Sequence, residues 1–231
     1  MLSRSGTQPI GALWLRSVAA RLLLGEYRVT SAGLKNAQID LLPTQEGEQA
    51  VAPKNPRFMG QYYTGATNGI KKNLDHLTQV IADTQAETVL DVGCMDGYTW
   101  ETVKTTQAEY LGVDINQEAI DYAREHYPGG AFYRSNLFAL DERFKADVVF
   151  CSRVLIHLPN FKQAVDHLRT LANKALVLVI KIGPKDDLKK YQVTDTEEQA
   201  IVYHRIFSEK TVREAAGKCT IIPGKYSTVI I

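Results

Sequence analysis

The residues of this chain that are best suited to chemistry lie in a glycine-rich segment directly after a short apolar one. The apolar segment spans residues 88–92 (TVLDV), and the segment after it reads Gly93-Cys94-Met95-Asp96-Gly97. Glycine allows positive φ angles and lets a backbone approach a ligand closely. In an open α/β sheet, ligands bind at the carboxyl ends of the strands. The segment therefore predicts a ligand-binding loop that joins a buried strand to a helix.

A further acid, Asp114, follows Asp91 by 23 residues and lies where the next apolar segment ends. A carboxylate at that place can accept hydrogen bonds from both hydroxyls of a ribose. A dinucleotide-binding turn has the spacing G-x-G-x-x-G, whereas Gly93 and Gly97 are separated by three residues. Asp91 and Asp96 would repel a pyrophosphate, but they suit a ligand that carries an ammonium and a sulfonium.

The elements that position these residues alternate regularly from residue 69 onward. We expect strands at 88–92, 110–114, 131–134, 146–151 and 175–182, and helices around 70–81, 98–105, 117–126, 161–171 and 209–216. Asn116 and Ser208 are suitable N-caps for two of these helices. Segments 219–222 and 227–231 flank a short Pro-Gly turn, so they must form an antiparallel hairpin. The order predicts an α/β fold with a doubly wound, mostly parallel seven-stranded sheet and an antiparallel C-terminal strand.

These segments together resemble the class I S-adenosylmethionine-dependent methyltransferases of the small-molecule type. The loop at 91–97 is similar to that family's Asp-x-Gly-x-Gly-x-Gly motif in its Asp-x-Gly-Cys form, and 147–159 (DVVFCSRVLIHLP) resembles its fourth-strand motif. Asp114 matches its ribose-binding acid. The sequence departs from the pattern at Met95, where glycine is usual. The resemblance covers about residues 69–231 and implies a Rossmann-like fold, S-adenosylmethionine as the cofactor and methyl transfer as the reaction.

The resemblance also implies which residues bind the cofactor. They are Asp91, Gly93, Cys94, Met95, Gly97, Asp114, Ile115, Asn136, Leu137, Ser152, Arg153, Tyr62 and Tyr63. Asn136 and Leu137 are expected near the adenine, although an ordinary turn asparagine is the alternative. An aromatic ring at Tyr62 or Tyr63 can shield the sulfonium, or can simply pack against the N-terminal segment. Arg153 can pair with the cofactor's carboxylate or with an acidic acceptor, or it can be a solvated cation of the loop.

His157 is the candidate general base, because an imidazole titrates near neutrality; local packing is the alternative. His204 and Arg205 either reach the acceptor pocket or have a structural role at the entry to the last helix. Residues 183–207 form a polar insert that is a candidate lid, or else a solvated face. No spacing of His, Cys, Asp or Glu suggests a metal site.

Composition narrows the acceptor class. The chain has 231 residues, 45% of them hydrophobic, and a net charge of +1, which excludes a wholly disordered protein and disfavours a nucleic-acid partner. Residues 151–154 (CSRV) lack the Asn/Asp-Pro-Pro-aromatic motif that is common in enzymes methylating amines of nucleobases or glutamine. We therefore expect a small-molecule acceptor with a hydroxyl or an amine, including sugar-like or lipid-like compounds. Three cysteines without C-x-x-C spacing suit a reducing compartment, and the cytoplasm is the default location.

The N-terminal part differs from the rest. We expect residues 1–66 to form a helical appendage and linker, rich in Pro and Gly over 42–66, and residues 67–231 to form the cofactor-binding domain. The apolar segment 10–24 reads as a helix packed on the domain or on a second copy; a membrane-surface helix and a transit peptide are the alternatives. A non-catalytic binding or scaffold module and a dinucleotide-dependent oxidoreductase are the competing functions. The oligomeric state stays open.

Overall fold

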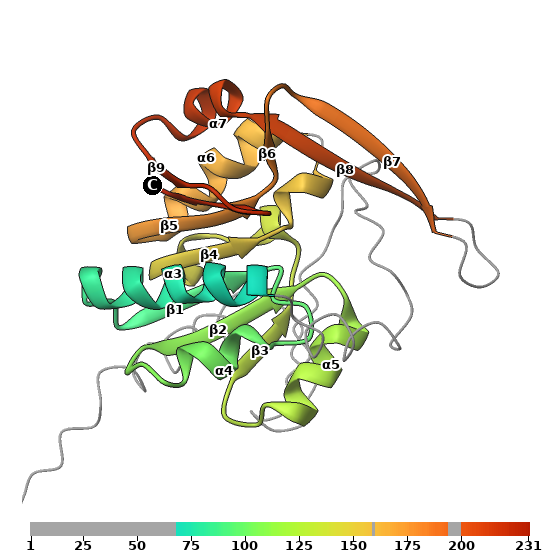
Figure 1. Ribbon diagram of the computed structural model, residues 1–231. Coiled ribbons are helices and arrows are strands. Elements are labelled where there is room, and N and C mark those ends of the chain that lie inside the picture. The colour runs from blue at the N-terminus through green and yellow to red at the C-terminus, as the bar shows by residue number, and fades with distance from the viewer. Residues whose placement is uncertain (1–67, 159, 194–199) are drawn as a thin grey trace, which may run out of the picture.

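The computed structural model describes residues 68–158, 160–193 and 200–231 (Figure 1). Its centre is a seven-stranded sheet with the order β3-β2-β1-β4-β5-β10-β9. The strands are β1 (Thr88–Val92), β2 (Glu109–Asp114), β3 (Ala131–Arg134), β4 (Ala146–Ser152), β5 (Ala172–Ile180), β9 (Thr220–Ile222) and β10 (Ser227–Ile230). Neighbouring strands run parallel from β3 to β5, whereas β10 is antiparallel to both β5 and β9. The predicted fold class is confirmed.

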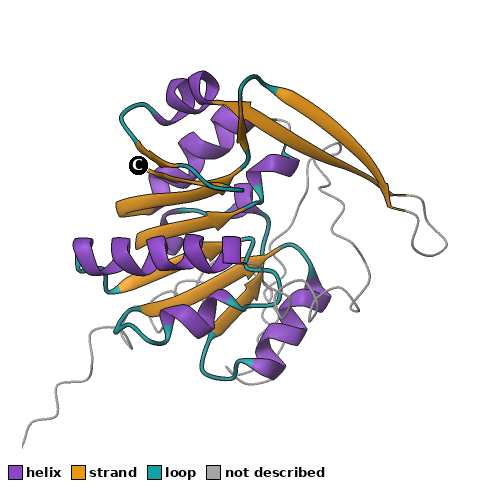
Figure 2. Cartoon of the chain, viewed as in Figure 1, coloured by secondary structure: helices purple, strands orange, loops and turns teal. Residues whose placement is uncertain are grey.

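Helices cover both faces of the sheet (Figure 2). They are α3 (Asn68–Thr84), α4 (Thr99–Val103), α5 (Gln117–His126), α6 (Phe161–Leu171) and α7 (Glu209–Ala216), with short 3₁₀ turns η2 (Leu137–Ala139), η3 (Glu142–Phe144) and η4 (Leu155–His157). Apolar side chains of α3, α4 and α5 pack on one face, and those of α6 and α7 on the other. The predicted caps are present: Asn116 accepts from the first turn of α5, and Ser208 accepts from Thr211 N at 3.2 Å.

The polar insert at 183–207 contains strands that the sequence pattern did not predict. β7 (Asp187–Val193) and β8 (Ala200–Ser208) form an antiparallel ribbon that extends away from the central sheet (Figure 1). The short strand β6 (Ile182–Gly183) pairs in parallel with the end of β8 and joins the ribbon to the domain. His204 and Arg205 therefore belong to a strand rather than to a loop.

Several expectations concern residues 1–67, which lie outside the described residues. These are the helical appendage and linker at 1–66, the domain boundary at 66/67, the apolar segment at 10–24, and Tyr62 and Tyr63. Within the described part of the chain, no helix is both long enough and apolar enough to cross a bilayer.

A buried polar contact ties α3 to the antiparallel strand β10. The Asn73 amide donates to the Thr228 hydroxyl at 2.8 Å and to the Tyr226 carbonyl at 3.2 Å. His76 Nδ1 lies 2.8 Å from the same hydroxyl. Thr228 is fully buried and Asn73 is nearly so. This hydroxyl therefore satisfies polar groups that water does not reach freely.

Replacing Thr228 with valine should destabilise the fold. The Thr228→Val change keeps the shape of the side chain but leaves Asn73 without its buried partner, which costs about 1–3 kcal/mol. Urea denaturation measures this loss. Thr170→Val is the matched control, because the Thr170 hydroxyl donates to a backbone carbonyl at the exposed end of α6. Equal stability of both variants would contradict the assigned role.

Candidate functional site

The loop between β1 and α4 is a tight turn that requires glycine at two positions, because of the backbone conformation and because of the space available there. Gly93 N and Cys94 N both donate to the Val113 carbonyl, at 2.7 and 3.0 Å. Gly93 has φ 79° and Gly97 has φ 82°, in the left-handed region. A Cβ on Gly93 would lie 2.0 Å from the side chain of Val154, and one on Gly97 would also meet neighbours below 3 Å. A side chain at either position is therefore excluded by space as well as by conformation.

Met95 occupies the left-handed region as well, with φ 49°. The loop thus keeps a glycine-like conformation at the position where the sequence departs from the family's pattern. The cost is roughly 1–2 kcal/mol for a residue with a side chain. The Met95 N–H donates to Asp114 Oδ2 at 2.9 Å, which helps to hold this conformation.

Three carboxyl groups surround the loop. Asp91 and Asp96 are 1% and 2% exposed, and Asp114 is partly buried. Burial raises the pKa of Asp91 to about 7, against hydrogen bonds from Tyr110 (2.7 Å) and Thr99 that lower it. Burial likewise raises the pKa of Asp96 to about 7 and lifts that of Asp114 above its usual range. A concentration of acids in such a site favours a cationic ligand.

Asp114 lies at the end of β2, next to the loop, as the sequence predicts. Its Oδ2 accepts from Met95 N, and its Oδ1 accepts from Asn116 N at 2.8 Å. A carboxylate oxygen can accept more than one hydrogen bond. The side chain therefore holds the loop and can still accept from ribose hydroxyls. Ile115 follows it, and the Ile115 carbonyl accepts from Arg134 Nε at 3.2 Å.

Asn136 and Leu137 follow β3, close to Asp114, because Ser135 N donates to the Asp114 carbonyl at 2.9 Å. The Asn136 side-chain oxygen accepts from Phe138 N at 2.9 Å and caps η2. This is the turn-capping alternative that the sequence left open.

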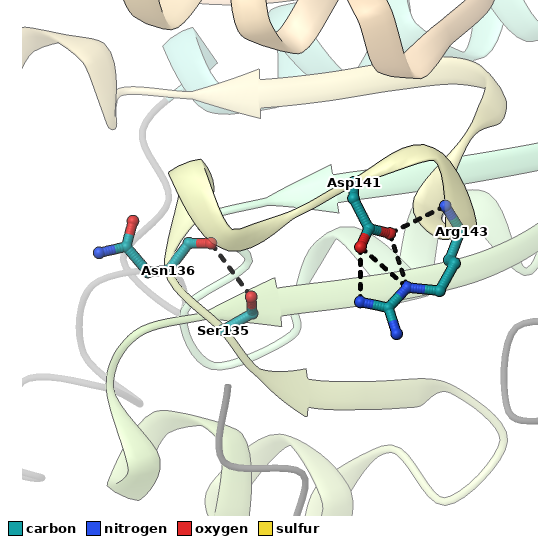
Figure 3. A network of polar contacts seen from close by, with 4 residues as sticks. All are labelled: Ser135, Asn136, Asp141 and Arg143. Atoms are coloured by element: carbon teal, nitrogen blue, oxygen red, sulfur yellow. Dashed lines mark hydrogen bonds and ion pairs between the residues drawn. The ribbon is translucent and has the colours of Figure 1, made fainter. Parts of the chain in front are cut away.

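Polar contacts stabilise the segment that carries Asn136. The Ser135 hydroxyl donates to the Asn136 carbonyl at 3.1 Å (Figure 3). Further along, the Arg143 guanidinium donates to both oxygens of Asp141, and this holds the pKa of Asp141 below its usual range (Figure 3). Asp141 also accepts from Arg143 N and so caps η3. These contacts hold the chain between β3 and β4.

A pocket opens beside the loop at the carboxyl end of β4. It is lined by Asn73, Leu74, Thr99, Phe150, Ser152, Arg153 and Tyr226. The sequence predicted Ser152 and Arg153 here and missed the others. Thr99 had a local signal, because it comes two residues after the last glycine of the loop. Tyr226 had none, since only the insertion of β10 beside β5 brings it to this edge.

Arg153 also has a positive φ, of 61°, and its N–H donates to the Val179 carbonyl at 2.8 Å. Strained backbone of this kind clusters at functional sites. His157 lies at the end of η4, partly buried, with its ring centroid 6.0 Å from that of His204.

The thiols near the site are poor nucleophiles. Cys94 and Cys151 are buried, and burial together with the nearby acids raises the pKa of each thiol well above its usual value. The thiolate is the reactive form of cysteine, so these side chains act as small core residues. Among the described residues, no group of three His, Cys, Asp or Glu is placed to hold a metal ion.

Comparison with known proteins agrees with this geometry. Residues 90–175 match the family model of a methyltransferase domain. The chain is 32% identical over 93 residues to a ubiquinone biosynthesis O-methyltransferase of Shewanella halifaxensis, a match that covers 38% of this chain and 39% of that protein. It is 29% identical over 110 residues to a trans-aconitate 2-methyltransferase of Rhodopseudomonas palustris, covering 47% and 43%. The chain thus matches about two fifths of the length of these relatives.

The fold extends the similarity beyond the matched segment. The structure of CalS10, an amino pentose methyltransferase from Micromonospora echinaspora with S-adenosylmethionine bound, superposes with a TM-score of 0.58 at 17% identity. The superposition covers 76% of this chain and 96% of that one. The chain therefore has the Rossmann-like fold of the class I S-adenosylmethionine-dependent methyltransferases. Within that fold, residues 90–175 are the part that matches the methyltransferase-domain model.

Replacing Gly93 with alanine should cost more stability than the same change at another glycine of positive φ. Gly217 has φ 68°, but a Cβ there would meet its nearest neighbour only at 3.8 Å. Gly217→Ala therefore carries a conformational cost alone, of about 1–3 kcal/mol, because φ 68° with ψ −131° is a glycine-type conformation. Gly93→Ala adds a clash with Val154 and should lose at least about 1 kcal/mol more. Urea denaturation compares the two; equal losses would show that the loop yields to a side chain.

The buried acids predict a pH dependence of stability. An aspartate in the unfolded chain has a pKa of about 3.9. Asp91 in the folded protein has a pKa of about 7. The folded state therefore binds more protons between these values, and the free energy of unfolding falls as the pH rises through this window. In Asp91→Asn, the fall between about pH 5 and pH 7 should be smaller than in the wild type.

Denaturation of the ligand-free protein at several pH values tests this dependence. Asp141→Asn is the control, because the pKa of Asp141 is lowered by Arg143. The stability that Asp141 contributes is lost only as the pH falls below the usual aspartate range. Above about pH 5, the free energy of unfolding of Asp141→Asn should therefore change with pH as steeply as that of the wild type. The same slope in Asp91→Asn as in the wild type would refute the assignment.

Proposed function

We propose that this chain is a methyltransferase that uses S-adenosylmethionine and transfers its methyl group to a hydroxyl or an amine of a small molecule. The observation that carries the proposal is the grouping of three carboxyls around a glycine loop at the carboxyl edge of the sheet. The cofactor carries an ammonium and a sulfonium, so it suits this charge. The methyltransferase-domain match over 90–175 supports the same conclusion.

The residues present fit the cofactor. The loop glycines pack against the protein's own side chains, since a Cβ on Gly93 would meet Val154 and one on Gly97 would meet Phe132. We assign the backbone of this loop to the methionine part of the cofactor. Asp114 would accept from the ribose hydroxyls. Asp91 and Asp96 would face the positive charges. The remaining proposed contacts are Cys94 and Met95 through their backbone, Ile115, Asn136 and Leu137 near the adenine, Ser152 and Arg153 at the pocket, and Tyr62 and Tyr63 as a cover.

The chain's own residues have to align the acceptor and exclude water. When bound, S-adenosylmethionine supplies an electrophilic methyl group. An acceptor hydroxyl or amine has to lose a proton, and we assign that proton to His157. Burial and the neighbouring charges of His157, Lys181 and Lys189 lower the pKa of the adjacent His204 from its usual value.

The acceptor is proposed to be a metabolite. The curated relatives are named for a ubiquinone precursor pathway and for trans-aconitate, and the structural neighbour for an amino pentose. The near-neutral charge of the chain argues against a nucleic-acid acceptor. We also propose that residues 67–231 form the cofactor-binding domain and that residues 1–66 are an appendage to it.

Ligand binding separates this function from its two alternatives. Calorimetry should detect micromolar binding of S-adenosylmethionine and S-adenosylhomocysteine to the wild type, and no binding of NAD. Asp114→Ala should weaken both sulfur ligands by about 1–3 kcal/mol, because it removes the ribose acceptor. Asp114→Asn keeps one oxygen for the loop amides and should recover part of the affinity.

Asp121→Ala is the control, because Asp121 is an exposed acid on α5 that contacts Gln117. Its affinity for the sulfur ligands should equal that of the wild type. A folded wild type that binds neither sulfur ligand would favour the scaffold alternative. Binding of NAD in their place would favour the oxidoreductase.

A further inference from the structure

Basic side chains gather around one tyrosine where the pocket meets the β7–β8 ribbon. The Tyr226 ring centre lies 5.5 Å from the Arg153 guanidinium carbon and 5.7 Å from Lys181 Nζ. The His204 ring stacks on the same tyrosine, with ring centroids 6.2 Å apart, and the His157 ring lies 6.0 Å from that of His204. Arg153 and Lys181 directly follow β4 and β5, so the cluster lies at the carboxyl edge of the sheet.

The ribbon adds a further cation to this cluster. Lys189 pairs with His204 across β7 and β8, so both side chains lie on the same face of the ribbon. The charges that lower the pKa of His204, after burial, are those of His157, Lys181 and Lys189. The surroundings of His204 are therefore basic. Arg205 belongs to the opposite face, because successive side chains of a strand alternate.

Two acids near the base of the ribbon accept hydrogen bonds from backbone and hydroxyl groups, and the charge of Arg153 acts on a third acid, Asp96. Asp186 accepts from the backbone and a hydroxyl at the start of α7. Asp187 accepts from Leu188 N at 2.9 Å. Among the residues that the structure describes, neither Lys181 nor Lys189 forms an ion pair; Lys181 Nζ donates to a backbone carbonyl at 2.8 Å. Positive charge is thus concentrated beside the pocket, and within the described ranges no carboxylate pairs with either lysine.

We propose that Lys181, Lys189 and His204 bind a carboxylate or phosphate group of the methyl acceptor beside the Tyr226 ring. The proposal rests on the proposed function and names the chemical class of its acceptor. Arg153 and Lys181, the two cations close to the Tyr226 ring, repel each other, and an anion bound beside Lys181 reduces that repulsion. His204 can donate a ring N–H to the same anion. Arg153 marks the border between this subsite and the pocket beside the loop.

Anion binding to the protein saturated with S-adenosylhomocysteine tests the proposal. The probes are inorganic phosphate and succinate, titrated separately by calorimetry at neutral pH and low salt. We expect at least one of them to bind in the millimolar range, and its affinity to fall about five-fold in Lys181→Gln and in Lys189→Gln. Binding of phosphate alone assigns a phosphate group, and binding of succinate alone assigns a carboxylate. The affinity for S-adenosylhomocysteine should be unchanged in both variants.

Lys210→Gln is the matched control, because Lys210 is an exposed lysine on α7 that pairs with Glu214. Equal anion affinity in all four proteins, or no binding of either probe, overturns the proposal. Competition between the anion and S-adenosylhomocysteine also overturns it, because the anion would then occupy the cofactor's own site. If the folded protein fails to bind S-adenosylhomocysteine, the proposed function fails, and the same titrations without it still decide the anion site.

Discussion

The geometry of the site depends on the hydrogen bonds that Asp114 accepts from backbone N–H groups, above all those of Met95 and Asn116. The hydrogen bond from Met95 N holds the loop after β1. The hydrogen bond from Asn116 N fixes the start of α5, because Asn116 is the N-cap of that helix. One carboxylate thereby joins the ends of β1 and β2. Both hydrogen bonds favour the ionised form and oppose the effect of burial on its pKa. The loop and Asp114, which we propose as the ribose acceptor, are consequently parts of one arrangement.

Charge is distributed unevenly across the carboxyl edge of the sheet. Asp91, Asp96 and Asp114 surround the loop, whereas Lys181 and Lys189 lie toward the ribbon. Burial disfavours the charged form of an acid, and the pKa of Asp91, raised in spite of hydrogen bonds from Tyr110 and Thr99, is one measure of that cost. A cationic ligand at the acidic end offsets the cost. Under the proposed function, the opposite charge at the other end fixes the orientation of an anionic acceptor relative to the cofactor.

Local signals made most of the fold predictable. β1, β3 and α5 begin and end at the predicted residues, because apolar runs, glycines and N-caps mark their limits. The β7–β8 ribbon escaped prediction since the segment that forms β7 (DLKKYQV) is polar and lacks a clear apolar alternation. The site divides in the same way. Asp114 and the loop glycines were predictable from their spacing, whereas Tyr226 reaches the pocket only through the order of the strands.

The space around the loop explains why methionine is accommodated at position 95 while glycine is required at positions 93 and 97. At Gly93 and Gly97 a Cβ has no room, so only glycine fits. Met95 shares their positive φ, but its side chain is accommodated and partly exposed. The substitution therefore costs strain alone, roughly 1–2 kcal/mol, and the hydrogen bond to Asp114 helps to hold it. Arg153 has the same kind of backbone across the pocket, held by the Val179 carbonyl, so strained residues with side chains lie both in the loop and in the pocket wall.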